Sequence, residues 1–386
     1  MGGDADVVVV GAGIAGASLA FELAADCRVV LLEREDRPGY HSTGRSAAML
    51  IESYGTDGVR GLTKASRPFF ERPPDGFSDV SLLSPRGYMH IAREDQFERL
   101  SALERKIRPH VPSLRRLSGA GVVATAPLID PSYVAAGLLE PNAMAIDDAA
   151  LHQGFLRGFA KRGGSLMTDA DVQKAIPGAG GTWSIETRAG RFEAPVMVNA
   201  AGAWADELAK LSGVRPVGLQ PKRRTAILLD PPDVNAPPSG GGGPPDGGGG
   251  PMINDVDEEF YVKPDGGALM VSPADETPSP PTDAQPEELD VAIAVDRYER
   301  LTGRPVKTIR QRWAGLRSFV SDHNPVIGFD DDVPGFFWLA GQGGFGIMTA
   351  PGAARLAADL IRERRPSGNL ENLLPALSPG RRGLHP

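Results

Sequence analysis

The stretch Val7–Gly16, VVVVGAGIAG, decides how the chain begins to fold. Its four consecutive valines predict a buried strand, and its three glycines predict a tight turn that opens a helix. Gly11 permits the turn, Gly13 lets a pyrophosphate approach the backbone, and Gly16 lets the helix pack closely against the strand. The amino terminus of such a helix offers unpaired N–H groups and a positive dipole end to phosphates. The pattern therefore predicts a dinucleotide site.

A second predicted strand, Val29–Leu32, ends at Glu33, roughly 20 residues after Gly11. A carboxylate at that distance is placed to accept hydrogen bonds from ribose hydroxyls. A glycine turn alone would have a structural role only, but two flanking strands and an acid favour the dinucleotide. NADP is disfavoured, because its 2′-phosphate would face Glu33.

Length and composition set wider limits. The chain has 386 residues, 41% of them hydrophobic, a net charge of −8 and one cysteine. It is long enough for one or two domains with a sizeable core. The acidic balance argues against nucleic-acid binding, and no apolar run approaches the about 18 residues that span a bilayer. We expect a cytoplasmic protein, with peripheral attachment to the inner membrane left open.

Two later stretches repeat the pattern of a buried strand, a glycine turn and a helix: Pro195–Trp204 and Gly335–Gly346. Ser81–Ala92 alternates enough to predict a pair of strands. Pro231–Pro251 is dominated by proline and glycine, which favours a surface loop, with a mobile flap over the active site as the alternative.

Longer motifs carry a family resemblance over nearly the whole chain. They are GYHSTGRSAA at Gly39–Ala48, LLSPR at Leu82–Arg86, ALHQG at Ala150–Gly154, VNAAGAW at Val198–Trp204, GLQPKRR at Gly218–Arg224, FYVKPD at Phe260–Asp265, WAGLRSFV at Trp313–Val320 and GFFWLAGQGGFGI at Gly335–Ile347. Together they resemble the glycine oxidase/D-amino-acid oxidase (DAO) family of FAD enzymes, and most closely its D-arginine dehydrogenase branch.

The resemblance implies an α/β fold: a Rossmann-like FAD-binding domain with an inserted α+β substrate domain built on an antiparallel sheet. It implies that residues 1–80, 145–215 and 325–386 form the FAD domain, and residues 81–144 and 216–324 the substrate domain. FAD should be non-covalent, because covalently flavinylated members use a cysteine late in the chain and Cys27 is the only cysteine here. No metal site is expected.

The resemblance, together with the glycine motif, assigns the cofactor-binding residues. They are Gly11, Gly13, Ile14, Ala15, Gly16, Glu33, Arg34, Ser42, Thr43, Gly44, Ser46, Ala47, Ala48, Val172, Ala200, Gly202, Trp204, Gly343, Gly344, Phe345, Gly346 and Ile347. In this set Val172 would contact adenine through its backbone. The helix that begins near Gly346 would direct its positive end at the flavin pyrimidine ring.

Oxidation of an amino acid requires its Cα hydride close to flavin N5, so the site needs a carboxylate clamp and an acceptor for the amine. Arg223 and Arg317 are the clamp candidates, because a desolvated carboxylate favours the planar fork of arginine. By resemblance, Tyr261 and Tyr54 donate to the same carboxylate, and carbonyls around Gly344 receive the amine. Ordinary packing is the alternative for both tyrosines.

The two arginines have different alternatives. Lys222–Arg224 alternates in direction along a strand, so only one face of this basic run turns inward. From the residues alone a solvated edge is favoured, and the family match instead assigns Arg223 to the substrate. Arg317 lies in an apolar context, where an arginine requires a buried anion, and a structural salt bridge is its alternative.

The side-chain pocket departs from that of D-arginine dehydrogenases. Where they present a glutamate to the guanidinium, this chain has Tyr88, and their polar pocket positions correspond to Met49, Ile51 and Met348. A cationic side chain would therefore meet no counter-charge. We expect apolar or aromatic D-amino acids such as D-Leu, D-Met or D-Phe.

Three rival functions stay open on the sequence. One is a peroxide-producing oxidase of glycine, sarcosine or a cyclic secondary amine. Another is an NAD(P)H-dependent monooxygenase, which the lack of a second Gly-x-Gly-x-x-Gly motif disfavours. The third is a non-enzymatic flavin-binding protein. The electron acceptor, a quinone or an electron-transfer protein, is not determined.

Overall fold

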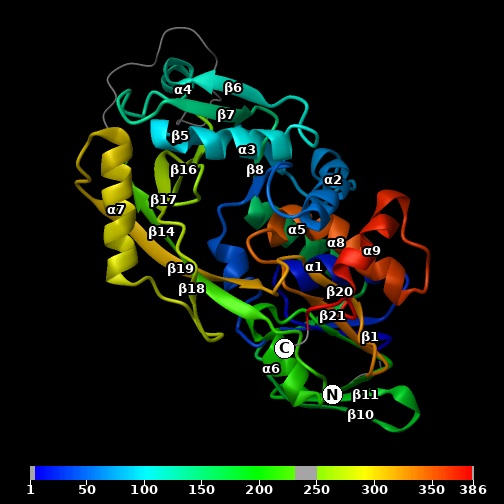
Figure 1. The fold of residues 1–386 in the computed structure, drawn as a ribbon. Coiled ribbons are helices and arrows are strands. Elements are labelled where there is room, and N and C mark those ends of the chain that lie inside the picture. The colour runs from blue at the N-terminus through cyan, green and yellow to red at the C-terminus, as the bar shows by residue number, and fades with distance from the viewer. Residues whose placement is uncertain (1–4, 231–249, 385–386) are drawn as a thin grey trace.

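The computed structural model describes residues 5–230 and 250–384 and is built around a six-stranded sheet (Figure 1). The strand order is β20 (Val326–Phe329), β21 (Phe336–Ala340), β13 (Val196–Asn199), β1 (Val7–Val10), β2 (Val29–Leu32) and β9 (Ser165–Met167). β20 is antiparallel to β21, and the other neighbours are parallel. β1, β13 and β21 each lead through glycine into a helix, as predicted, so three helix starts meet at one edge of the sheet.

Both faces of this sheet are covered, which explains the run of valines in β1. Val7 and Val9 face a core shared with helices, whereas Val8 and Val10 face a second core. The first face carries α1 (Ile14–Leu23), α5 (Asp148–Lys161) and α8 (Gly346–Ile361), with α2 (Asp57–Glu71), the 3₁₀ helix Gly368–Leu373 and α9 (Leu374–Leu377) packed outside.

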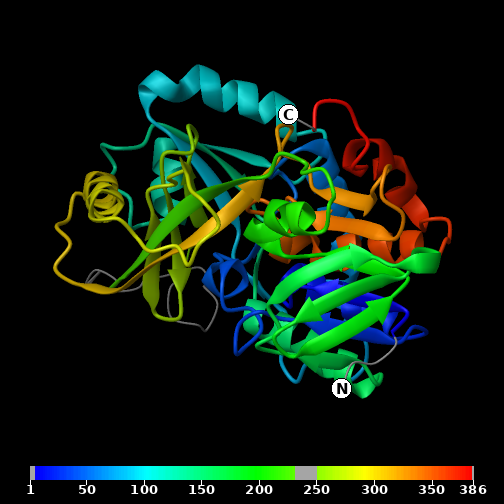
Figure 2. The same cartoon turned by 90° about the horizontal axis from the view of Figure 1, so that it is seen from below.

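The second face is covered by a three-stranded antiparallel sheet and a short helix. These are β10 (Val172–Pro177), β11 (Trp183–Thr187), β12 (Gly190–Ala194) and α6 (Ala205–Leu211). Trp183 and Trp338 are fully buried in the core between the two sheets. Seen from below, the green three-stranded sheet lies across the blue strands (Figure 2).

A large, mainly antiparallel sheet forms the other half of the molecule. Its order is β18 (Thr277–Pro278), β14 (Gln220–Leu229), β17 (Ala268–Ser272), β16 (Tyr261–Asp265), β15 (Met252–Asp255), β5 (Tyr88–Ala92), β7 (Ala136–Glu140) and β6 (Arg115–Ser118), with β19 (Ile309–Phe319) paired to β14. α7 (Glu288–Thr302), α3 (Phe97–Ile107) and α4 (Gly119–Thr125) pack against it. In Figure 1, α7 lies along the outer side of β14 and β17.

The prediction that Ser81–Ala92 forms a pair of strands is wrong in its pairing. β4 (Leu83–Pro85) joins β3 (Met49–Leu50) and β8 (Met144–Ile146) in a small sheet, whereas β5 pairs with β7 and β15. Both strands find distant partners, which local alternation does not specify.

The observed architecture confirms the predicted mixed α/β fold class, with a mainly parallel sheet beside a mainly antiparallel one. The domain boundaries stay a prediction. Most of Pro231–Pro251 lies outside the described residues, so its assignment as a loop or flap also stays a prediction. None of the described helices combines the length and apolar character needed to cross a bilayer.

Candidate active site

Three cavities follow one another through the molecule, and their linings overlap. The first, of about 420 Å³, shares Gly13 and Thr43 with the second, of about 140 Å³. The second shares Arg317 and Gly344 with the third, of about 50 Å³. The shared residues place the three cavities next to one another, and together they form a space that runs from the glycine turn after β1 to the large sheet.

The glycine turn at the start of this space is fixed by close backbone contacts. Gly11 has φ +103°, and a Cβ there would lie 2.4 Å from the carbonyl oxygen of Ala200. A Cβ on Gly16 would lie 1.8 Å from the carbonyl oxygen of Gly11. Gly13 begins α1 without a side-chain cap, and the Ile14 N–H donates to Thr43 Oγ1 at 3.0 Å. The turn therefore needs glycine for packing at two of its three positions.

Glu33 lies at the end of β2, beside the glycine turn. It is 8% exposed, and its carboxylate accepts from the N–H of Ala12 and of Glu35, each at 3.0 Å. Burial raises the pKa of Glu33, and the backbone hydrogen bonds partly oppose that rise. Glu33 thus holds the glycine turn against β2, and each carboxylate oxygen retains a lone pair for the ribose predicted from the sequence.

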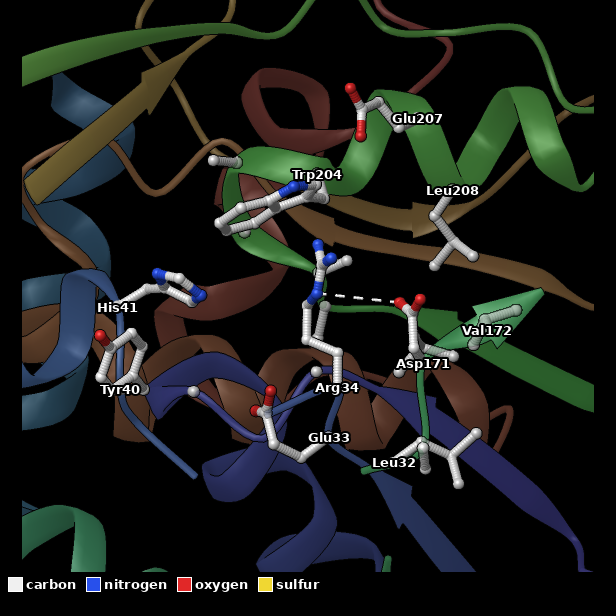
Figure 3. Close-up of a pocket in the computed structure, with 18 of the residues that line it drawn as sticks. Leu32, Glu33, Arg34, Tyr40, His41, Asp171, Val172, Trp204, Glu207 and Leu208 are labelled. Atoms are coloured by element: carbon white, nitrogen blue, oxygen red, sulfur yellow. Dashed lines mark ion pairs between the residues drawn. The ribbon is translucent and has the colours of Figure 1, made fainter. Parts of the chain in front are cut away.

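The wide end of the first cavity carries a cation stacked on an aromatic ring (Figure 3). The guanidinium of Arg34 lies 4.9 Å from the ring centroid of Trp204, and its Nε lies 3.7 Å from the carboxylate of Asp171. Val172 lines the same cavity from the start of β10. This planar, partly charged wall offers a stacking surface to a flat aromatic group.

The third cavity is lined by phenol rings and a guanidinium. Tyr54, Tyr88 and Tyr261 all face it, together with Arg317 from β19. A Cβ on Gly344 would lie 3.0 Å from the guanidinium carbon of Arg317, so the glycine leaves room for that side chain. Burial lowers the pKa of Arg317, but Tyr261, Tyr54 and nearby Glu276 more than compensate and raise it overall.

A second guanidinium, that of Arg224 on β14, lines the same space. Its Nε donates to the carbonyl oxygen of Asp275 at 2.8 Å, and its Nη2 lies 3.1 Å from Glu276. Burial lowers the pKa of Arg224, and the charge of Arg317 lowers it further. The two guanidiniums thus repel each other, which favours binding of a further anion beside them.

The comparisons with known proteins agree with this geometry. A family model for FAD-dependent oxidoreductases, named DAO, matches residues 6–360. The chain belongs to the DAO family. It is 23% identical to mitochondrial dimethylglycine dehydrogenase of Mus musculus, over 96% of this chain but 44% of that protein. This DAO-family chain therefore spans less than half the length of that relative.

Solved structures share the DAO-family fold. Glycine oxidase from Geobacillus kaustophilus is 20% identical, with a TM-score of 0.81 over 96% of this chain and 98% of the other. L-proline dehydrogenase from P. horikoshii is 18% identical, with a TM-score of 0.82 over 98% and 100% of the two chains. At these identities the likeness shows the fold alone.

The DAO-family chain is FAD-dependent, and its three adjoining cavities are the candidate site for the cofactor. From the predicted roles of the lining residues we expect the adenosine end in the first cavity and the ring system in the second, with the pyrophosphate beside Gly13. Predicted cofactor residues that line the first two cavities are Gly11, Gly13, Ile14, Ala15, Glu33, Arg34, Ser42, Thr43, Ser46, Ala47, Val172, Ala200, Gly202, Trp204, Gly343, Gly344, Gly346 and Ile347. Ala48 lines the third.

Three predicted cofactor residues line none of the three cavities. Gly16 packs against the glycine turn, and Gly44 donates its N–H to the carbonyl oxygen of Gly39 at 3.0 Å. Phe345 is buried and packs edge-on against Tyr54, with 5.1 Å between the ring centroids. These three residues pack behind the residues that line the cavities.

The prediction that Arg223 clamps the substrate is wrong. Arg223 points to α7, where it pairs with Glu287 and lies 2.9 Å from Asp290. In the β14–β19 ladder, Lys222 lies opposite Arg317, and Arg224 shares the face of Lys222. The alternation along Lys222–Arg224 was therefore predicted correctly, but the inward face is the other one, so Arg224 takes the position assigned to Arg223.

The predicted side-chain pocket comes together in the third cavity. Met49, Ile51, Tyr88 and Met348 all line it. The argument that a cationic side chain would meet no counter-charge is nevertheless wrong, because Glu258 lines the same cavity.

The sequence analysis also missed Glu140. This residue is 2% exposed, and its carboxylate accepts from the N–H of Glu52 at 2.8 Å and of Ser53 at 3.2 Å. Glu140 therefore fixes the loop that carries Tyr54. Neither glutamate lies in a motif that signals its role, since both depend on contacts between strands distant in sequence.

Proposed function

We propose that this DAO-family protein is a dehydrogenase that oxidatively deaminates D-amino acids. The amino acid loses two electrons and the hydrogen on Cα to give an imino acid. Water then hydrolyses the imino acid to a 2-oxo acid and ammonia. The observation that carries the proposal is the pair of half-buried guanidiniums, Arg224 and Arg317, beside Tyr261 and Gly344 in the lining of the same cavities.

The substrate carboxylate would occupy the space between the two guanidiniums. A carboxylate accepts bidentate hydrogen bonds from arginine, and the mutual repulsion of Arg224 and Arg317 falls when an anion lies between them. Tyr54 and Tyr261 would add phenolic donors. Burial keeps the pKa of Tyr54 above its ordinary value, so its hydroxyl stays protonated and donates at neutral pH.

The amine end of the substrate needs an acceptor and must lose a proton. The carbonyl oxygens around Gly344 supply the acceptor in this proposal. Burial holds the pKa of Tyr88 far above its ordinary value, so this phenol stays protonated at neutral pH and cannot accept the amine proton. We therefore assign proton loss from the ammonium group to water, and the main catalytic effect to positioning of Cα.

A bound FAD supplies the acceptor for the two electrons and the Cα hydrogen. Helix α8 begins at Gly346 in the lining of the second cavity, and its unpaired N–H groups and dipole favour negative charge there. This arrangement supports a two-electron oxidation at the boundary between the second and third cavities.

The side chain of the substrate would lie against an apolar wall. Met49, Ile51, Met252 and Met348 line the third cavity, and methionine side chains adapt to varied shapes. Preference for the D configuration is supported by the motifs shared with D-arginine dehydrogenases.

An N-methylated glycine is the second candidate substrate. The third cavity has only about 50 Å³, and the similar mouse protein is named a dimethylglycine dehydrogenase. A small secondary or tertiary amine would fill that volume with its carboxylate still held by Arg224 and Arg317.

Anaerobic mixing of the purified flavoprotein with a substrate panel tests both candidates. The panel contains D-Leu, D-Met, D-Phe and D-Arg, their L forms, glycine, sarcosine and dimethylglycine. We expect the D-amino acids to bleach the flavin absorbance fastest. Faster bleaching by L forms or by N-methylglycines would overturn the D-amino-acid assignment, and no bleaching by any compound would favour a non-enzymatic flavin-binding protein. Peroxide formation in air, compared with dye reduction, separates an oxidase from a dehydrogenase.

A further inference from the structure

Glu258 places a negative charge in the wall of the third cavity, in a part that the second cavity does not share. It lies in the short turn between β15 and β16, is exposed, and yet lines the third cavity with Tyr54 and Tyr88. An exposed residue in a cavity wall stands at the opening of that cavity. Arg317, by contrast, lies where the third cavity joins the second. The cavity is therefore positive at its inner end and negative at its opening.

The backbone of the turn holds Glu258 in an unfavourable conformation. Its φ is +58°, which side chains other than glycine and asparagine rarely adopt. Its N–H donates to the carbonyl oxygen of Asp255 at 2.9 Å. The turn is fixed further by Asp257, which pairs with Arg99 at 2.9 Å and accepts from Gln96 at 2.7 Å. The backbone of Glu258 is thus held in place at a cost in backbone energy, and this sets where its side chain leaves the turn.

Two neighbouring acids, Asp255 and Asp257, differ from Glu258 in having ion-pair partners. Asp255 lies 3.4 Å from Arg93, and Asp257 pairs with Arg99. Glu258 makes no ion pair within residues 5–230 and 250–384. Its charge raises the pKa of both Tyr54 and Tyr88, so it acts electrostatically on the rings that line the cavity. A cavity-lining carboxylate without an ion pair among the described residues is available to a cationic ligand.

We propose that Glu258 determines which substrates are preferred, according to the charge at the end of the substrate's side chain. It favours a substrate whose side chain ends in a cation and disfavours one that ends in a second carboxylate. The apolar wall of methionines contacts the methylene stem between the two ends. This inference rests on the proposed function, because it requires the substrate carboxylate to lie at Arg224 and Arg317.

Binding of small carboxylates to the FAD-loaded protein tests the proposal without turnover. The probes are pentanoate, 5-aminopentanoate and glutarate, which share one carboxylate and differ at the other end. Perturbation of the flavin absorbance gives each Kd for the wild type, Glu258→Gln and the matched control Glu259→Gln. Glu259 is adjacent, exposed and lines none of the three cavities.

We expect the preference for 5-aminopentanoate over pentanoate to fall about fivefold in Glu258→Gln, and the discrimination against glutarate to fall by a similar factor. Both effects should weaken at high salt, because the cavity opening is solvated. Glu259→Gln should leave both ratios unchanged. Ratios that are equal in the wild type and Glu258→Gln, or that change as much in Glu259→Gln, would overturn the role of Glu258. If none of the probes binds the wild type, the carboxylate clamp of the proposed function fails, and this inference fails with it.

Discussion

The three consecutive cationic residues on β14 show how much of a side chain's position can be predicted from the sequence. Alternation along a strand places Lys222 and Arg224 on one face and Arg223 on the other, and the structure agrees. The same pattern does not say which face is inward, because a shift of one residue exchanges the faces. That choice is made by α7, whose acids Glu287 and Asp290 take up Arg223.

Conservative substitutions at Arg224, Arg317 and Arg223 distinguish the proposed carboxylate clamp from a structural ion pair. In Arg317→Lys and Arg224→Lys the planar fork is replaced by a single ammonium group, so bidentate binding of the carboxylate is lost. We expect kcat/KM for the best amino acid to fall about 100-fold in each, mainly through KM. Rates of anaerobic flavin reduction at varied substrate concentration measure this. Arg223→Lys is the matched control, expected within about twofold of the wild type, and a large loss there would reinstate Arg223 in the clamp.

Asp148, at the start of α5, gives a test of pH dependence. Burial raises its pKa from 3.8 to about 6, although Lys263 and the backbone N–H groups of Asp148 and Ala149 oppose the rise. A carboxyl whose pKa is raised on folding favours the folded state at low pH, and this contribution is lost as the pH rises through about 6. Asp148→Asn removes the cost of ionisation. We expect its free energy of unfolding to exceed that of the wild type above pH 6, by at most about 3 kcal/mol, with the difference shrinking toward pH 4.

Urea denaturation of Asp148→Asn and the wild type at several pH values between 4.5 and 7.5 measures that difference. A difference that stays constant over this range would show that Asp148 titrates at an ordinary pKa.

At the scale of elements, local sequence signals predicted where helices and strands begin and end better than they predicted which strands pair. The start of α2 carries a local signal, because Thr56 precedes it and its Oγ1 accepts from the Val59 N–H at 3.2 Å. The three strand–glycine–helix units were predicted because each is contained in a short stretch. β4 and β5 were also found as strands, but their partners come from distant parts of the chain.

Glu140 on β7 holds the loop that carries Tyr54, because its carboxylate accepts from the N–H groups of Glu52 and Ser53. A substitution of Glu140 should therefore affect the whole loop. Glu140→Ala leaves the N–H groups of Glu52 and Ser53 without their acceptors. An unsatisfied buried donor costs about 1–3 kcal/mol, so we expect lower stability and a less ordered loop. KM should rise about tenfold with kcat changed much less, since Tyr54 is expected to bind the substrate carboxylate.

A double-mutant cycle with Tyr54→Phe distinguishes this positioning role from a general loss of stability. If Glu140 acts through the loop, the effects on KM of Glu140→Ala and Tyr54→Phe should be less than additive. Additive effects would show that Glu140 supports the fold without positioning Tyr54. Glu140→Gln keeps one acceptor oxygen and should restore part of the wild-type KM.

At the scale of the whole molecule, the cofactor space joins segments from every part of the chain. The second cavity is lined by Gly13 near the amino terminus, Ala200 in the middle and Gly346 near the carboxyl end. The family motifs predicted most of these positions because each motif is local. Glu258 and Glu140 were not predicted, because their roles arise only when β15, β7 and the Tyr54 loop meet.

This arrangement predicts that FAD stabilises the whole fold. It also predicts that a substitution at Gly13 can weaken cofactor binding without preventing folding. Gly13 has φ −68°, so alanine fits the backbone, and a Cβ there would meet only Thr43 Oγ1, at 3.2 Å. The added methyl group would nevertheless stand in the wall shared by the first two cavities, where the pyrophosphate is expected. We expect Gly13→Ala to fold but to lose most of its flavin.

Thermal unfolding with and without added FAD measures this effect. The wild type should gain about 4 kcal/mol at an FAD concentration 1,000 times its Kd, whereas Gly13→Ala should match the wild-type apoprotein with little gain. Gly11→Ala should instead fail to fold, because its Cβ would lie 2.4 Å from the carbonyl oxygen of Ala200. Gly213→Ala is the control for the strain of a positive φ, since a Cβ there has no neighbour within 4 Å and the site is outside the cavities. Normal flavin content in Gly13→Ala would place the pyrophosphate elsewhere.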